Sequence, residues 1–363
     1  MSQPFRVLAI NPGSTSTKIA CFDGTACIME RTLRHAAADL SAFASINDQR
    51  TMRRRAVLEA LDEAEIAPTS LSAVVGRGGL LHPLTGGTYQ VNHQMLVDLE
   101  TGVQGAHASN LGGILADEIA RSGDGCFSFI VDPVVVDELA DEARYSGIPG
   151  LPRTSIFHAL NQKAVARRYA AEQGRSYGEL SLVVAHLGGG ITVGTHRHGR
   201  VVEVNDGLNG EGPFSPERSG GVAALKLVDQ CFAPTADQAA IRRSIKGAGG
   251  LMGYLGTTDA REISERIRKG DQEAEAVYRA MAWQIVREIG ASAAVLGSAP
   301  EAILLTGGLA YDDLLVGWIT EKVAWLGPVH RYPGEDEMTA LAEGALRVLE
   351  GREDALEYRG AHR

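Results

Sequence analysis

Residues 6–24 read RVLAINPGSTSTKIACFDG, in which two apolar runs, 6–10 and 19–22, flank the polar segment 11–18. Short apolar runs bounded by Gly, Asn and Asp predict strands, and the Asp-Gly pair that closes the stretch predicts a turn. The sequence therefore predicts a β-hairpin whose connecting turn carries hydroxyls, a glycine and a lysine. This hairpin decides the fold, because its layout recurs later in the chain.

The second half of the chain repeats that layout. An apolar run at 180–185 is followed by HLGGGITVG at 186–194, by a Gly-containing turn and by a further apolar run at 201–204. Both halves thus read strand, Gly/Thr loop, strand, Gly turn, strand. A supersecondary unit that occurs twice indicates an ancestral duplication, so we expect two similar domains that face each other.

The rest of the chain alternates apolar strands with helical patterns, which predicts an α/β architecture. The expected helix 154–172 carries His158 on its early turns. Further strands are expected at 73–75, 127–131 and 302–305, and further helices at 41–65, 93–121, 259–296, 311–326 and up to about 349.

Composition narrows the class of protein. The chain has 363 residues, 44% hydrophobic and 22% charged, with a formal net charge of −10, so bulk electrostatics do not favour nucleic acid as a partner. No apolar run reaches the roughly 18–20 residues that span a bilayer. The four cysteines lack CxxC or Cys/His spacing, which argues against a zinc site or a disulfide framework. Together these features favour a cytoplasmic globular enzyme.

Three glycine-containing loops could hold phosphate or nucleotide. Backbone N–H groups of the turn 11–18 could bind anionic oxygens, although a polar hairpin turn explains it equally well. It is not a Walker A loop, because Thr17 stands where that motif has Gly. The loop 186–194 has more glycine than a hairpin needs. The segment 304–309, LLTGGL, predicts a strand that enters a helix through bare backbone, where a base or ribose could lie.

Arginine is the residue best suited to hold a transferring phosphoryl group. Arg77 lies within Gly-Arg-Gly-Gly, and Arg218 lies in the loop 213–221, so both are candidates, with a surface ion pair as the alternative for each. For His158, a core or capping role is the simpler explanation. Acidic candidates for Mg²⁺ are Asp132 and the triplet 335–337, although acids at a helix start also stabilise its N-terminus.

These motifs resemble a known family. The segments 11–18, 185–191 (AHLGGGI) and 305–308 (LTGG) occur in the order seen in the acetate and butyrate kinases, members of the actin-like ATPase superfamily. The resemblance extends from residue 6 to about 350, and the segments 149–158 and 206–215 are similar to the butyrate branch. It implies two duplicated ribonuclease H-like α/β domains with the active site in the interdomain cleft: 1–150 plus about 338–363, and 151–337 with the nucleotide site.

The resemblance also implies an activity: reversible phosphoryl transfer between ATP and a short-chain carboxylate, with Mg²⁺. It further implies that the protein is a homodimer. The implied catalytic residues are Arg77, Asp132, His158, Arg218 and His107. The implied nucleotide-binding residues are Asn11, Ser14, Ser16, Lys18, His186, Gly188, Gly189, Gly190, Gly307 and Gly308. Asn11 and Glu337 would place the metal, with Glu335 as the alternative acid.

One departure bears on the substrate. Acetate kinases carry Asn at the position of Gly189, so that contact is not expected here, and the difference favours butyrate as the acid. Acetate, propionate or a branched acid such as isobutyrate remains an alternative. An actin-like ATPase switch without kinase activity is the alternative from another class.

Overall fold

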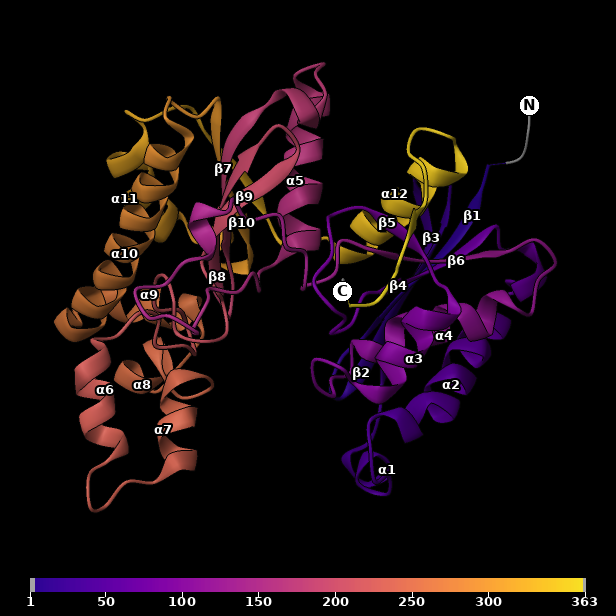
Figure 1. Cartoon of the computed structure of the whole chain (residues 1–363), viewed down its shortest axis with the longest axis horizontal. Helices are drawn as coiled ribbons and strands as arrows, with labels where there is room; N and C mark the ends of the chain where they lie inside the picture. The colour runs from indigo at the N-terminus through magenta and orange to yellow at the C-terminus, as the bar shows by residue number, and fades with distance from the viewer. Residues whose placement is uncertain (1–3, 362–363) are drawn as a thin grey trace. The chain divides into compact units, whose positions relative to one another are not determined.

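The computed structural model describes residues 4–361. The chain divides into two compact units: unit 1 comprises Met1–Val136 with Asp336–Arg363, and unit 2 comprises Asp137–Glu335. Figure 1 shows that the last helix, in yellow, lies among the first strands, in indigo, so the chain ends in the unit where it begins. Within residues 4–361, no helix combines the length and apolar character that a membrane-spanning segment requires.

Unit 1 contains a mixed sheet built around the first hairpin. β1 (Arg6–Pro12) pairs antiparallel with β2 (Ser16–Asp23), and β2 pairs antiparallel with β3 (Ala26–Arg34). On the other side of β1, β4 (Ala73–Arg77) and then β6 (Phe127–Val131) add in parallel. The full order is β12-β5-β6-β4-β1-β2-β3, with β5 at Thr88–Gln90 and β12 at Leu356–Glu357.

Unit 2 repeats this arrangement. β7 pairs antiparallel with β8 and β8 with β9, while β10 and then β11 add in parallel on the other side of β7. The order β11-β10-β7-β8-β9 matches β6-β4-β1-β2-β3 of unit 1 strand for strand and direction for direction. The predicted duplicated α/β fold is therefore confirmed. The strands are β7 (Ser181–Leu187), β8 (Ile191–Arg197), β9 (Arg200–Val204), β10 (Ala302–Gly307) and β11 (Val329–Pro333).

Helices cover both faces of the unit 1 sheet. Consecutive residues of a strand point to opposite faces, and all four residues from Val7 to Ile10 are fully buried. α4 (Asn110–Ala120) and α12 (Glu337–Leu349) both pack on β1, β4 and β6, and Figure 1 shows them on opposite sides of the sheet. The remaining helices of this unit are α1 (Ala37–Ser41), α2 (Arg50–Glu63) and α3 (His93–Thr101).

The unit 2 sheet is likewise enclosed. Leu182 and Val184 of β7 join the core on the side of α5 (Ala159–Glu172), whereas Val183 and Ala185 join the core formed with α10 (Gln272–Leu296). This alternation places β7 at the centre of a three-layer unit. The other helices are α6 (Ala224–Cys231), α7 (Gln238–Ile245), α8 (Gly250–Leu255), α9 (Ala260–Arg268) and α11 (Asp313–Val323).

Several expected helices are shorter in the structure, and the long helix in the segment 41–65, for example, spans only Arg50–Glu63. The segment 93–121 forms two helices, because α3 ends at Gly102, which adopts a left-handed conformation with φ +65°. The segment 259–296 also forms two, because the Asp271 side chain caps α10 by accepting from the Ala274 N–H. His158 is the N-cap residue of α5 and does not lie on its early turns, which corrects the expected start of that helix.

Close backbone contact joins α4 to β4. A Cβ atom added at Gly112 would lie 2.1 Å from the carbonyl oxygen of Arg77, and one added at Gly76 would lie 2.0 Å from the oxygen of Gly112. No real Cβ fits at such distances, so α4 can approach the strand only because both residues are glycines. This contact fixes the backbone from which the Arg77 side chain projects.

We expect Gly112→Ala to lower the free energy of unfolding by about 2 kcal/mol or more, because the obstructing atoms are backbone and cannot rotate away. The matched control is Gly290→Ala, in the interior of α10, where an added Cβ meets no atom within 4 Å. That variant should be more stable by roughly 0.5–1 kcal/mol, from helix propensity alone. Urea unfolding measures both. Equal effects of the two substitutions would contradict the close-packing account.

Candidate functional site

The first hairpin turn presents backbone and hydroxyl groups at its tip. The Gly13 N–H donates to the Ser16 carbonyl at 2.7 Å, Ser14 is exposed and Ser16 is half-buried. Lys18 lies within β2, where its Nζ forms an ion pair with Glu30 on β3 at 2.7 Å. The predicted phosphate-loop residues Ser14 and Ser16 thus lie together at the turn, whereas the Lys18 ammonium is engaged on the neighbouring strand.

A buried arginine that the sequence analysis did not single out supports this turn. Arg53 of α2 is fully buried, and its guanidinium donates to the carbonyls of Ser14 and Ser16 and to the Thr17 hydroxyl, at 3.0–3.2 Å. Gln49 Oε1 accepts two further bonds. Burial lowers the pKa of Arg53 from its ordinary value. A cation held beneath the turn favours anionic oxygens near it.

Glu337 connects two of the predicted residues of unit 1. Its Oε1 pairs with Arg77 Nη1 at 2.8 Å, and its Oε2 accepts from Asn11 Nδ2 at 2.5 Å. Glu337 is the first residue of α12, directly after Asp336 in a left-handed conformation. Asn11, Arg77 and Glu337 therefore form one hydrogen-bonded cluster at the ends of β1, β4 and α12.

Two other candidates lie in unit 1. Asp132 follows β6, is fully buried and has φ +37°, a conformation that costs energy for a residue with a side chain. Its Oδ1 accepts from the Gly87 N–H at 2.7 Å. His107 is exposed in the loop before α4, and its Nδ1 accepts from the Ser109 N–H at 3.2 Å. The strained backbone at Asp132 is the feature more typical of a functional site.

In unit 2, two predicted histidines stack on each other. The rings of His158 and His186 lie 3.7 Å apart between centroids, with 9° between their planes. His158 Nδ1 is 3.0 Å from Thr192 Oγ1, and His186 Nδ1 is 2.7 Å from Asn161 Oδ1. His186 is 1% exposed, and its Nε2 lies 3.5 Å from Glu335 Oε1.

Behind His158 lies a buried polar chain. Gln162 Nε2 donates to the hydroxyl and the carbonyl oxygen of Thr192, and Gln162 Oε1 lies 3.0 Å from His196 Nε2. His196 Nδ1 is 2.7 Å from the Tyr177 hydroxyl. Thr192, Gln162 and His196 are fully buried. Burial, and then the nearby Lys163 and Arg167, lower the pKa of His196 well below its usual range.

Two glycines, Gly207 and Gly190, determine where the Arg218 guanidinium lies. Its Nη1 donates to the Gly207 carbonyl at 2.6 Å, and a Cβ added at Gly190 would lie 1.8 Å from that same nitrogen. Within the described part of the chain, the buried Nε of Arg218 has no hydrogen-bond partner. Burial lowers the pKa of this guanidinium. An arginine seated on bare backbone with an unsatisfied donor is suited to bind an anion.

The three consecutive glycines at 188–190 have different structural roles. Gly190 makes room for Arg218, and a Cβ at Gly188 would lie 2.8 Å from His186 Nε2. Gly189 leaves ordinary space, and its carbonyl accepts from Ser215 Oγ at 2.6 Å. The loop therefore brings bare backbone next to both an arginine and a histidine. Gly207 links the groups further, because an added Cβ there would contact both Thr192 and Arg218.

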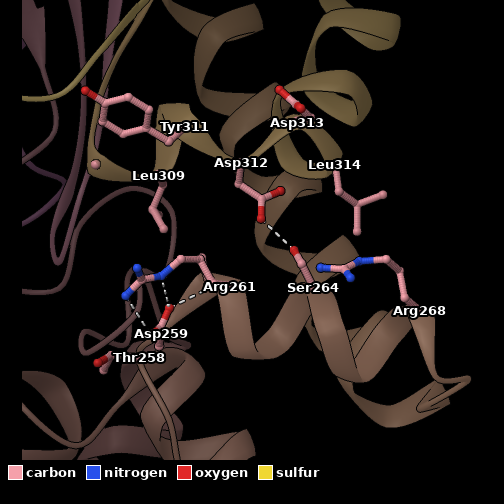
Figure 2. Close-up of a pocket in the computed structure, with 12 residues that line it drawn as sticks. Thr258, Asp259, Arg261, Ser264, Arg268, Leu309, Tyr311, Asp312, Asp313 and Leu314 are labelled. Carbon is pink, nitrogen blue, oxygen red and sulfur yellow. Dashed lines mark hydrogen bonds and ion pairs between the residues drawn. The ribbon is translucent and has the colours of Figure 1, made fainter.

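A cavity of about 690 Å³ lies beside the Gly-Gly pair at 307–308, which follows β10. Gly308 lines it, whereas Gly307, with φ +88°, packs against the Leu187 backbone. Figure 2 shows side chains of α9 facing those of α11 across the cavity, with Ser264 Oγ donating to Asp312 at 2.5 Å. The sequence analysis did not identify the polar lining, because it placed most of these residues within the expected helices 259–296 and 311–326. The polar lining comprises Thr258, Asp259, Arg261, Ser264, Arg268, Tyr311, Asp312 and Asp313.

The donor set of unit 1 fits Mg²⁺. Among the described residues, no group of three or more His, Cys, Asp or Glu side chains is arranged to hold a metal ion. Mg²⁺ commonly takes only one or two protein oxygens and completes its shell with water and substrate phosphates. The Glu337 carboxylate and the side-chain oxygen of Asn11 are hard oxygen ligands of the kind that Mg²⁺ takes, and the hydrogen bond from the Asn11 amide nitrogen to Glu337 Oε2 keeps the two side chains together.

Comparison with known proteins gives the family. The acetokinase family profile matches residues 150–327. Butyrate kinase 2 of Clostridium acetobutylicum is 51% identical over 98% of this chain and 99% of its own length, and butyrate kinase 1 of that organism is 52% identical over 98% and 100%. The chain belongs to the acetokinase family.

The fold comparison agrees with this family. The acetate kinase of Porphyromonas gingivalis superposes with a TM-score of 0.74 at 17% identity, over 94% of this chain and 99% of that one. At this identity the match shows the shared fold. Members of the acetokinase family are ATP-dependent kinases, so the chain is a kinase that acts with ATP.

The buried His196 predicts a pH dependence of stability. The folded protein holds it neutral, whereas the unfolded chain takes up a proton below about pH 6.5, so stability falls as pH drops through that value. The contribution is at most about 1.4 kcal/mol per pH unit. We expect the loss of unfolding free energy between about pH 7.5 and about pH 5.5 to be smaller in His196→Asn. The exposed His198→Asn is the control, and an unchanged loss in His196→Asn would contradict the assignment.

Proposed function

We infer that the chain is a butyrate kinase, which transfers the γ-phosphoryl group of ATP reversibly to butyrate and yields butyryl phosphate and ADP. The observation that carries this is identity above one half, over nearly the whole chain, to two butyrate kinases. The arginines and histidines described above supply the chemistry that such a transfer requires.

The reaction needs no base. Butyrate is already ionised at neutral pH, so a carboxylate oxygen attacks the γ-phosphorus directly, the bond to the bridging oxygen breaks, and its electron pair leaves on ADP. Catalysis then depends on positioning and on positive charge at the equatorial oxygens. This explains a site rich in N–H donors, among them the guanidinium groups of Arg77 and Arg218.

We assign the unit 2 donors to the transferring group. Arg218 would hold its oxygens with the guanidinium that Gly190 admits, and His158 would donate to one of them in the transition state. The backbone of 188–190 would bind phosphate. The cavity beside Gly308 would take the nucleoside, and its size suits a ligand of that class.

We assign the unit 1 cluster to the acid and the metal. Arg77 uses one of its five N–H donors on Glu337, which orients the guanidinium toward a substrate carboxylate. Asp132 would lie beside the reacting group, and the turn around Ser14 and Ser16 would bind phosphate. When bound, Mg²⁺ would neutralise charge between phosphates, with Glu337, in preference to Glu335, and Asn11 as its protein contacts.

We further propose a homodimer. The apolar residues Val222, Leu225, Val228 and Phe232 are 46–84% exposed and recur at helical spacing. Leu225 and Val228 lie in α6, none of whose residues is buried, and Val222 and Phe232 lie just outside its two ends. A second copy of the chain would cover this stripe. We also propose a cytoplasmic location, where ATP is available and thiols persist, because all four cysteines are free.

Substitution of either arginine should remove most of the activity. We expect Arg77→Ala and Arg218→Ala each to lower turnover with ATP and butyrate at least about 100-fold, equivalent to roughly 2.7 kcal/mol of barrier. Hydroxylamine trapping of butyryl phosphate measures this. The exposed Arg200→Ala serves as the control and should keep near-wild-type turnover. Near-wild-type turnover in either arginine variant would remove that residue from the mechanism, and a wild type without product would refute the activity.

Charge placed on the α6 stripe should separate the dimer. We expect Leu225→Asp with Phe232→Asp to yield monomers in sedimentation equilibrium, because burying the two carboxylates would cost more than the contact contributes. Lys226→Asp, on the same helix but outside the stripe, should remain dimeric. A wild type that is already monomeric, or a double variant that stays dimeric, would contradict this interface.

A further inference from the structure

The buried chain behind His158 has a determined direction of hydrogen bonding. Gln162 Nε2 lies 3.0 Å from the Thr192 carbonyl, which can only accept, so the amide must present its N–H₂ to Thr192 and its oxygen to His196. His196 Nε2, 3.0 Å from that oxygen, must therefore carry a proton. The amide orientation thus determines the protonation of the next ring.

The same reasoning extends outward to Tyr177. His196 is neutral, since burial and two nearby cations oppose its charge, and a neutral ring protonated at Nε2 accepts at Nδ1. The Tyr177 hydroxyl, 2.7 Å away, then donates to Nδ1. A glycine makes this contact possible, because a Cβ at Gly194 would lie 2.4 Å from Gln162 Oε1.

It also extends inward to His158. Thr192 Oγ1 accepts from Gln162 Nε2 at 2.9 Å, and its own hydrogen needs an acceptor, because the side chain is fully buried. His158 Nδ1, 3.0 Å away, is that acceptor. If His158 instead donated from Nδ1, the buried Thr192 hydroxyl hydrogen would be left unpaired, at a cost of about 1–3 kcal/mol. A neutral His158 that accepts at Nδ1 carries its proton on Nε2.

The neighbouring ring is set in the opposite tautomer. Asn161 Nδ2 donates to the Glu335 carbonyl at 2.9 Å, so Asn161 Oδ1 faces His186 and accepts from its Nδ1–H. The two stacked rings, 3.7 Å apart, are thus fixed by separate partners.

We propose that Thr192, Gln162, His196 and Tyr177 form a positioning relay that holds His158 in the neutral tautomer with its proton on Nε2, so that the ring presents an N–H donor to the transferring phosphoryl group. The inference rests on the proposed kinase reaction. It explains how a histidine can donate at pH values where an unconstrained ring would divide its proton between two nitrogens. The residues of the relay do not touch substrate; they act through His158.

Nuclear magnetic resonance tests the tautomer without substrate. In protein labelled with ¹⁵N-histidine, two-bond correlations distinguish protonated from unprotonated ring nitrogens, and the His158 signals among the ten histidines are those lost in His158→Gln. We expect protonated Nε2 and unprotonated Nδ1 at neutral pH in the wild type. An Nδ1–H ring or an imidazolium in the wild type would overturn the proposal.

Kinetics test its consequence with a matched pair of variants. Thr192→Val keeps the shape but removes the hydroxyl, and we expect kcat to fall at least about 10-fold while KM for ATP and butyrate stays within about twofold. Thr192→Ser keeps the hydroxyl and should retain most of the wild-type kcat. Equal kcat in the two variants would overturn the relay. Should Thr192→Val fail to bind nucleotide, the wild-type spectrum still decides the tautomer.

The two readouts separate this inference from the reaction on which it rests. A wild type with the Nε2–H tautomer but no acyl phosphate product would refute the kinase reaction and leave the tautomer in place. A wild type that makes acyl phosphate with the opposite tautomer would refute the relay alone.

Discussion

The absence of a side chain at two glycines is the constraint on which the site depends. Gly112 lets α4 touch the backbone of Arg77, and Gly190 leaves the space that the Arg218 guanidinium occupies. In both units, therefore, a residue without a side chain determines where a candidate arginine lies. A methyl group at either position would overlap atoms that cannot move away cheaply, so the arginines and the fold that presents them are specified by the same residues.

Each of three candidate site groups is oriented by a second side chain that contacts it. Arg53 supports the first turn from below, Glu337 holds Arg77, and Thr192 holds His158. Such support matters for phosphoryl transfer, because the enzyme performs little covalent chemistry and contributes mainly prealigned charge and hydrogen bonds. The buried polar groups are costly unless they are satisfied, which explains why they form continuous chains from the core to the site.

Much of the fold could be predicted, because its decisive signal is local. A hairpin of two apolar runs and a Gly/Thr turn occurs twice in the sequence, and both copies form the same three antiparallel strands. Helix boundaries were less accurate, since a left-handed Gly102 and the Asp271 cap act within one or two residues. Of the candidate site, the motif residues could be proposed from the sequence, whereas Arg53 has the sequence context of any surface cation on a basic helix. The Gln162–His196 contact joins residues 34 apart in sequence and leaves no local pattern. The glycines on either side of Arg77 serve packing, because a Cβ added at Gly76, Gly78 or Gly79 would lie 2.0–2.5 Å from atoms of other residues.

The most direct test of the kinase assignment is hydroxylamine trapping of acyl phosphate with ATP, Mg²⁺ and a panel of acids from formate to valerate, with isobutyrate and isovalerate included. The account predicts a maximum at butyrate or at a branched acid of the same carbon number. A maximum at acetate would contradict the substrate while keeping the family chemistry. No hydroxamate with any acid, in protein that still binds ATP, would contradict the account as a whole.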